Sequence, residues 1–215
     1  AAVFSGTGGT SYVLRWTITN GLCSTLDEVA INFNVVPTTA NAGGDQDQCG
    51  LGDFTLNGNI AVVGTGTWSI AGAANGATIT TPASESSTVT GLNAGSSVTL
   101  RWTITNGGCV SFDEVVLTNS AAPPVANAGV DETLCNSAVF TLAANAPAPG
   151  IGLWTIDGGV ANITNTASPT TTVTGIPAGT SVTLRWTVSN GSCSTFDVVV
   201  LTNSAPPVAS NAGPD

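Results

Sequence analysis

Cysteine is the side chain in this sequence best able to form new covalent bonds, and the chain has five of them. Two recurring positions account for all five: Cys49 and Cys135 end the first predicted strand of a repeated unit, and Cys23, Cys109 and Cys193 follow the turn before its last predicted strand. Their spacing is not that of a zinc site, and β-rich secreted domains of low charge favour disulfide bonds. We therefore predict that these cysteines form disulfides.

Two disulfide pairings are consistent with the sequence. Bonds within one repeat would join Cys49 to Cys109 and Cys135 to Cys193. If the first strand runs parallel to the last, however, each such pair would lie on the order of 25 Å apart for eight-residue strands, whereas a disulfide requires Cα atoms within about 7 Å. A bond between neighbouring repeats would instead join Cys49 to Cys193, and Cys23, Cys109 and Cys135 would then bond to repeats outside this sequence. We favour the second pairing, but both stay open because the strand order is inferred.

Few residues are suited to catalysis. The chain has no His, so its Ser and Cys residues lack the imidazole partner of a catalytic triad. Acids do occur side by side, as in Asp27-Glu28, but neighbours along a strand point to opposite faces and cannot converge as an acid–base couple. Asp45 and Asp47 share one side of a strand; a Ca²⁺ site there is the alternative to a solvated loop, which we favour because the other repeats lack the second Asp. We predict no catalytic residue, no cofactor and no enzymatic activity.

The charge of the chain excludes further classes of partner. Its 13 acids and 3 basic residues give a net charge of −10, which would repel a nucleic-acid backbone and an anionic membrane surface. No apolar run approaches the roughly 20 residues of a membrane-spanning helix. Because 42 % of the residues are apolar, low charge here does not indicate disorder. We predict no nucleic-acid binding and no membrane insertion.

Two sequence motifs recur with one period and define the domain organisation. The segment Leu-Arg-Trp-Thr starts at Leu14, Leu100 and Leu184, so its Arg residues are 86 and 84 positions apart. The segment Asn-Ala-Gly-x-Asp ends at Asp45, Asp131 and Asp215, with the same two spacings. We therefore predict the C-terminal part of one repeat at 1–38, complete repeats at 39–124 and 125–208, and the first strand of a further repeat at 209–215. The sequence on this reading is a window of a longer chain.

Within each repeat the apolar residues alternate with period two, which indicates strands and not helices. In the third repeat Val182, Leu184, Trp186 and Val188 share one face of a strand that ends at the turn Asn190-Gly191. About seven short strands in some 85 residues, with frequent turn signals, predict a Greek-key β-sandwich. Five Trp residues fall on the apolar side of such strands, and we expect them to pack in the cores as structural residues rather than to bind sugars: Trp16, Trp68, Trp102, Trp154 and Trp186.

The only basic residues are Arg, and all hold the same repeat position: Arg15, Arg101 and Arg185. Each lies on the outward side of its strand in an acidic protein, so we expect a structural ion pair within its own repeat. The candidate partners are the Asp of the Asn-Ala-Gly-x-Asp motif and an Asp on the last strand: Asp27, Asp113 or Asp197.

The motifs together resemble a known group of proteins. The Asn-Ala-Gly-x-Asp start, the Cys-Asn-Ser turn before Phe-Thr-Leu, the Gly-Leu-Trp-Thr-Ile strand and the Thr-Leu-Arg-Trp-Thr-x-x-Asn-Gly strand are similar to PKD-like and immunoglobulin-like repeats of giant surface proteins of Bacteroidota. The resemblance covers the whole chain, although the Trp-Asp-Phe-Gly-Asp-Gly motif of typical PKD domains is absent. It implies an extracellular adhesin or filament on the cell surface, exported by type IX secretion.

Three functions are compatible with these observations. A structural stalk or filament, which spans distance from the cell surface, predicts near-identical repeats without a unique site, and this is the pattern found; its partners would be neighbouring repeats of the same long chain and other copies in a fibre. A glycan- or protein-binding module with an unknown ligand would need an exposed, divergent loop cluster, for which only 60–66 and 146–152 are candidates. Spacer domains of a secreted polysaccharide hydrolase are the third reading. We favour the stalk.

Overall fold

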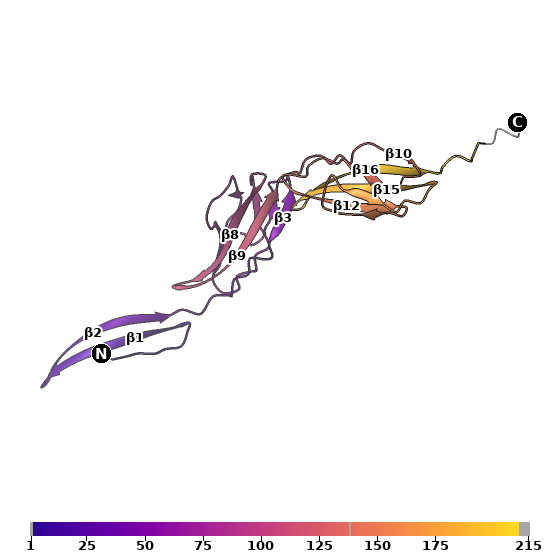
Figure 1. Ribbon diagram of the computed structural model, residues 1–215. Coiled ribbons are helices and arrows are strands. Elements are labelled where there is room, and N and C mark those ends of the chain that lie inside the picture. The colour runs from indigo at the N-terminus through magenta and orange to yellow at the C-terminus, as the bar shows by residue number, and fades with distance from the viewer. Residues whose placement is uncertain (1, 138, 211–215) are drawn as a thin grey trace, which may run out of the picture. The chain divides into compact units, whose positions relative to one another are not determined.

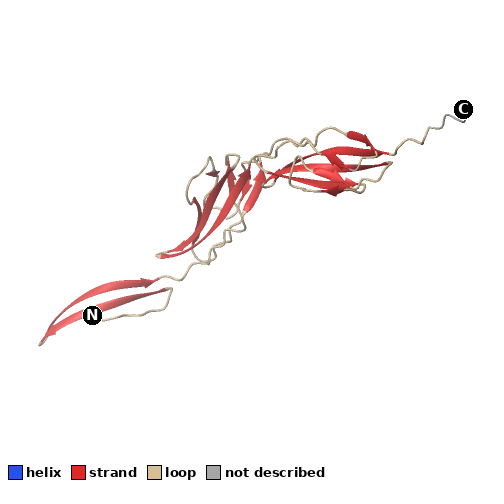
Figure 2. Ribbon diagram, viewed as in Figure 1, coloured by secondary structure: helices blue, strands red, loops and turns tan. Residues whose placement is uncertain are grey.

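Alternating apolar residues give strands throughout this chain. The computed structural model describes residues 2–137 and 139–210, and every regular element among them is a β-strand (Figures 1 and 2). The chain divides into two compact units: one comprises the residues up to 46 together with 52–118, and the other comprises 47–51 together with the residues from 119 onward. The strand predicted at 209–215 falls largely on residues 211–215, which lie outside the described residues.

The first unit begins with a long hairpin of two antiparallel strands, β1 (Thr10–Asn20) and β2 (Cys23–Phe33). No other described strand pairs with it, and no described sheet covers its apolar face. Trp16, which the sequence predicts as a core residue, is 72 % exposed in the described structure, which contains only this hairpin of its repeat. Burial of one face of a strand requires a second sheet over that face, and none of the described strands forms such a sheet over β1.

The rest of the first unit belongs to the repeat 39–124, whose seven strands form two sheets. One sheet has the order β3-β9-β8-β5 and the other β4-β7-β6. The strands are β3 (Gln46–Cys49), β4 (Phe54–Thr55), β5 (Thr65–Ile70), β6 (Thr78–Ile79), β7 (Thr88–Thr90), β8 (Ser96–Asn106) and β9 (Cys109–Ser120). Residues 47–49 of β3 and 119–120 of β9 belong to the second unit.

The repeat 125–208 forms the same two sheets in the second unit, with the orders β10-β16-β15-β12 and β11-β14-β13. Its strands are β10 (Glu132–Cys135), β11 (Val139–Thr141), β12 (Ile151–Gly158), β13 (Asn162–Ile163), β14 (Thr172–Thr174), β15 (Thr180–Asn190) and β16 (Cys193–Ser204). The first strand, β10, runs parallel to the last, β16, while β16 and β12 are antiparallel to β15. The predicted all-β sandwich fold is confirmed.

A pair of Trp residues occupies each core. Trp68 on β5 lies directly across from Trp102 on β8, and Trp154 on β12 lies directly across from Trp186 on β15. The ring centroids of both pairs are 5.0 Å apart, and all four side chains are at most 3 % exposed. The two rings of each pair are therefore neighbours within one sheet, and together they face the opposite sheet. Aromatic pairs of this kind add about 0.5–1.5 kcal/mol beyond the burial of their area.

Candidate functional site

The cysteines that come together are Cys49, the last residue of β3, and Cys193, the first residue of β16. They form a disulfide with a Cα–Cα distance of 4.9 Å across 144 positions of sequence, and both belong to the second compact unit. Cys49 comes from the repeat 39–124 and Cys193 from the repeat 125–208, so the bond, which we call the staple, links two sequence repeats.

The pairing within one repeat, Cys49–Cys109 and Cys135–Cys193, is wrong. In the repeat 125–208 the parallel register places Cys135 opposite Ser204, at the end of β16, whereas Cys193 is the first residue of that strand. The twelve residues of β16 separate the two cysteines by far more than a disulfide can span. Cys109 and Cys135 are free thiols in the structure, as is Cys23.

A hydrogen-bonded cluster surrounds the staple. One carboxylate, that of Asp47, accepts bonds from the Ser120 hydroxyl (2.7 Å), the Ser192 hydroxyl (3.2 Å) and the Ser192 N–H (3.1 Å). The Sγ atom of Cys193 is buried and lies 3.3 Å from the carbonyl oxygen of Ser120. Bonds to a charged acceptor are roughly twice as strong as neutral ones. The cluster therefore fixes the turn before Cys193 against the residues next to Cys49. The sequence pattern predicts Asp47 only in a loop or a Ca²⁺ site.

The Asn-Gly turn before the last strand makes a contact that recurs. In the second unit Asn190 donates from Nδ2 to the carbonyl oxygen of Ala121 (2.9 Å), and in the first unit Asn106 donates to that of Val35 (2.9 Å). The glycine after each Asn has positive φ and no room for a side chain. A Cβ on Gly191 would overlap the Ser120 hydroxyl. The Asn-Gly pair therefore forms a turn and also contacts the residues that follow the last strand of the preceding repeat.

A second recurring device attaches the start of each repeat to its own last strand. Two backbone N–H groups of the Asn-Ala-Gly-x-Asp region donate to side chains on the last strand, and the Asp of the motif accepts an N–H from that strand. The three bonds, which we call the latch, are Ala40 N to Ser111 Oγ (2.9 Å), Ala42 N to Asp113 Oδ2 (2.8 Å) and Val116 N to Asp45 Oδ1 (2.8 Å).

The latch is repeated in the second unit with the same geometry. Its bonds are Ala126 N to Thr195 Oγ1 (3.0 Å), Ala128 N to Asp197 Oδ2 (2.9 Å) and Val200 N to Asp131 Oδ1 (2.9 Å). These roles of Ser111 and Thr195 were missed from the sequence, although the presence of a hydroxyl residue two positions before the last-strand Asp in all repeats was the available signal. The latch Asp residues accept backbone bonds and are not bonded to Arg.

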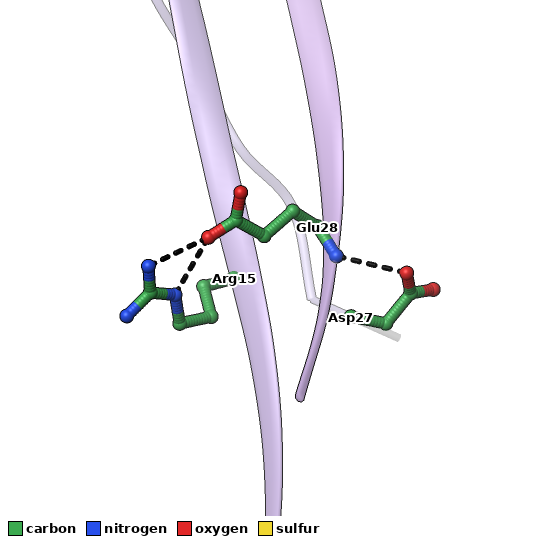
Figure 3. Close-up of polar contacts among 3 residues, drawn as sticks. All are labelled: Arg15, Asp27 and Glu28. Atoms are coloured by element: carbon green, nitrogen blue, oxygen red, sulfur yellow. Dashed lines mark hydrogen bonds and ion pairs between the residues drawn. The ribbon is translucent and has the colours of Figure 1, made fainter. Parts of the chain in front are cut away.

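The outward-facing Arg next to each Trp of the Leu-Arg-Trp-Thr motif forms an ion pair, but its partner is a different acid from the predicted one. Arg15 lies 2.7 Å from Glu28 through both Nε and Nη2, as Figure 3 shows. The strand register places Arg15 opposite Glu28, and Asp27 opposite Trp16 on the other face. The prediction of Asp27 as partner is therefore wrong, because successive side chains of a strand point to opposite faces.

The same correction applies to Arg101, which bonds Glu114 at 2.7 Å and not Asp113. Its guanidinium carbon also lies 4.3 Å from the centroid of the Phe112 ring. Because the side chains of the pair are 41 % and 40 % exposed, water screens the interaction, and we expect it to stabilise the fold by less than about 1 kcal/mol.

In the repeat 125–208 the corresponding acid is absent, since Val198 lies opposite Arg185. The guanidinium bonds Asp157 at the end of β12 instead, at 2.6 Å, and not Asp197. An ion pair is thus kept at this position through a different strand.

A separate exposed contact in the first unit joins the Thr7 N–H to the Tyr12 hydroxyl oxygen at 3.1 Å, and this backbone hydrogen bond lowers the pKa of Tyr12.

No three of the Asp, Glu and Cys residues in the described part of the chain gather as a set of metal ligands. Asp45 and Asp47, the predicted alternative for Ca²⁺, each accept the hydrogen bonds given above. None of the described residues form a helix long and apolar enough to cross a membrane.

The two-sheet architecture is shared with solved structures. Extracellular domains 3–5 of Drosophila OTK match with a TM-score of 0.55 and 9% identity, over 86% of this chain and 69% of that one. The fold is immunoglobulin-like. Titin domains I67–I69 (TM-score 0.48, 12% identity, 80% of this chain and 67% of that one) and the fibronectin(III)-like modules of Clostridium thermocellum CbhA (TM-score 0.48, 8% identity, 82% and 100%) also match. No protein-family profile and no curated protein sequence matches the chain.

Proposed function

We propose that the chain is a structural segment of an extracellular stalk or filament, in which immunoglobulin-like repeats span distance from the cell surface. The observation that carries the proposal is the staple, which bonds a residue of one sequence repeat to a residue of the next. Such a bond limits how far the chain between Cys49 and Cys193 can extend, which benefits a protein that works under tension.

Two further features support this role. The latch and the Asn-Gly turn contact both recur, so the described repeats use the same internal devices where a dedicated binding protein would differ between domains. Disulfides persist in oxidising compartments outside the cytosol, which fits an extracellular location. The motif resemblance to giant surface proteins of Bacteroidota supports a stalk in that setting, with type IX secretion as its route.

Electron microscopy of the native, full-length protein tests the proposal. Thin fibres or long stalks, lengthened in proportion to the number of repeats in engineered versions, are the expected result. A compact particle whose dimensions do not change when repeats are added would overturn the stalk function.

A further inference from the structure

The outward face of one sheet in the repeat 125–208 carries exposed apolar side chains. Leu153 and Phe196 lie on either side of Thr187 in one row across the strands β12, β15 and β16. Val198 lies opposite Arg185 in the next row. Four apolar side chains of this face are between 42 % and 72 % exposed, and we call them the apolar patch: Ile151, Leu153, Phe196 and Val198.

The repeat 39–124 has the same strand order but a more polar face at these positions. Its residues at the positions of the apolar patch, in chain order, are Thr65, Thr67, Phe112 and Glu114. Only the aromatic ring is common to the two repeats. Both sets of residues support the same two sheets, so the fold itself does not require the apolar set. Contiguous exposed apolar side chains are typical of interaction sites, and the patch therefore points to a contact outside its own repeat.

The charges of this face are balanced and held in place. Among the residues of β12, β15 and β16, those that carry charge are Asp157, Arg185 and Asp197. Asp197 points to the other face and accepts the N–H of Ala128, whereas Arg185 bonds Asp157 at 2.6 Å. The guanidinium carbon of Arg185 also lies 4.3 Å from the centroid of the Phe196 ring. The face therefore has no net charge, and its long side chain is already fixed, so binding would cost little side-chain entropy.

A second copy of this chain is the partner that fits such a face. The net charge of −10 makes two copies repel each other over most of their surface, so they approach best where the surface is neutral and apolar. Each face has one charge of each sign, and in a two-fold contact Arg185 of one copy can lie near Asp157 of the other. A glycan fits less well, because the guanidinium already covers one side of the Phe196 ring.

The size of the face indicates how strong this contact is. Three strands about 4.8 Å apart, over eight residues of about 3.3 Å each, cover about 370 Å². A stable dimer buries about 800 Å² on each partner. One contact is therefore too small to hold two chains together tightly. In long chains such contacts would add up, because the first contact raises the effective concentration for the next.

We infer that the apolar patch is a lateral contact between copies of this chain, in which two outward sheet faces pack against each other. The inference deepens the proposed stalk function, since such contacts would hold stalks side by side. It rests on that function only for its biological purpose, because the association of the chain with itself is measured without it.

The test is sedimentation of the whole chain, with its staple oxidised, at concentrations up to about 1 mM, where a dissociation constant of that order is detected. The three free thiols are first alkylated so that no disulfide forms between copies. The expected result is reversible, concentration-dependent dimerisation. Higher salt should strengthen it, because salt screens the repulsion between two acidic chains. Dimerisation that salt weakens would assign the contact to charged groups and overturn the inference.

A variant that gives the repeat 125–208 the polar face of the repeat 39–124 provides the decisive comparison. It combines Ile151→Thr, Leu153→Thr and Val198→Glu, which are side chains that the same fold already carries at these positions. It should weaken dimerisation by about tenfold or more. The matched control removes two exposed apolar side chains outside the patch, through Val125→Thr and Val130→Glu, and should dimerise like the unchanged chain.

The reverse change tests whether the patch is sufficient. Thr65→Ile with Thr67→Leu places two patch residues on the repeat 39–124 and should strengthen association by supplying a second site. A chain that stays monomeric at all concentrations, which would leave the face to another protein or a glycan, overturns the inference. So does a polar-face variant that dimerises like the unchanged chain. Neither result affects the stalk proposal, since microscopy would then show stalks that lie singly instead of in bundles.

Discussion

The carboxylate of Asp47 accepts the backbone N–H of Ser192 at 3.1 Å, one residue before the stapled Cys193. The two residues are 145 positions apart in the sequence and lie in the same compact unit. The same carboxylate accepts the hydroxyl of Ser120, so a single acid holds the residues on both sides of the disulfide. The covalent bond is thus accompanied by a polar cluster that would keep the sulfurs close even when the bond is reduced.

Asp47→Ala should therefore weaken the region of the staple. Loss of the acceptor leaves the Ser192 N–H and the Ser120 hydroxyl without their partner, which should lower the unfolding free energy of the second unit by about 1 kcal/mol. It should also raise the rate at which a small thiol reduces Cys49–Cys193. Thr133 holds the repeat position of Asp47 and has no role in the staple, so Thr133→Ala is the control. Equal reduction rates in the two variants would contradict this role of Asp47.

Alanine at the turn glycines should separate the two functions of the Asn-Gly pair. Gly21 has φ of 63° and open space where a Cβ would lie, so Gly21→Ala should cost only the left-handed strain of about 1 kcal/mol. Gly191 has φ of 56°, and its Cβ would also overlap Ser120, which should add about 1–3 kcal/mol. Thermal unfolding of both variants measures the difference. Equal losses would show that the turn does not dock.

Trp186 and Trp16 hold the same repeat position in opposite environments, since the first is fully buried and the second 72 % exposed. Trp186→Ala should lower the unfolding free energy of the second unit by about 3–5 kcal/mol. Trp16→Ala should change stability by less than about 0.5 kcal/mol. Guanidinium unfolding followed by far-UV circular dichroism provides the comparison. A large loss for Trp16→Ala would reveal a covered surface on the hairpin.

Mechanical unfolding should reveal the staple directly. When the chain is pulled from its two ends, the 144 positions between Cys49 and Cys193 cannot extend while the bond is intact, so reduction should release about 500 Å of additional contour length. Cys49→Ser should give the reduced length without reductant. Cys135→Ser, which removes a thiol outside the staple, should retain the shorter length. A chain of identical extension under oxidising and reducing conditions would exclude the bond.

The alternation of apolar residues was sufficient to predict the strands, because side chains in a strand change face with every residue. The frequent turn signals within each 84–86-residue repeat then predicted the all-β sandwich. The same patterns showed that the five cysteines occupy two recurring positions of the repeat and that the Trp residues lie on the apolar faces of their strands. The choice between disulfide pairings needed the direction of the first strand relative to the last. That direction depends on which strands are neighbours in the sheet, and composition does not encode it.

Other features were decided only by the tertiary structure. Arg15 and Arg101 bond the glutamates directly opposite them, whereas Arg185 turns to Asp157 on another strand, because cross-strand register and not sequence distance determines which charges meet. Trp16 has the same local sequence as Trp186, yet it is exposed because burial requires a second sheet. The sequence by itself determined the strands and the faces that their side chains occupy. The tertiary structure decided what each face meets, since that depends on long-range pairing between residues far apart in the chain.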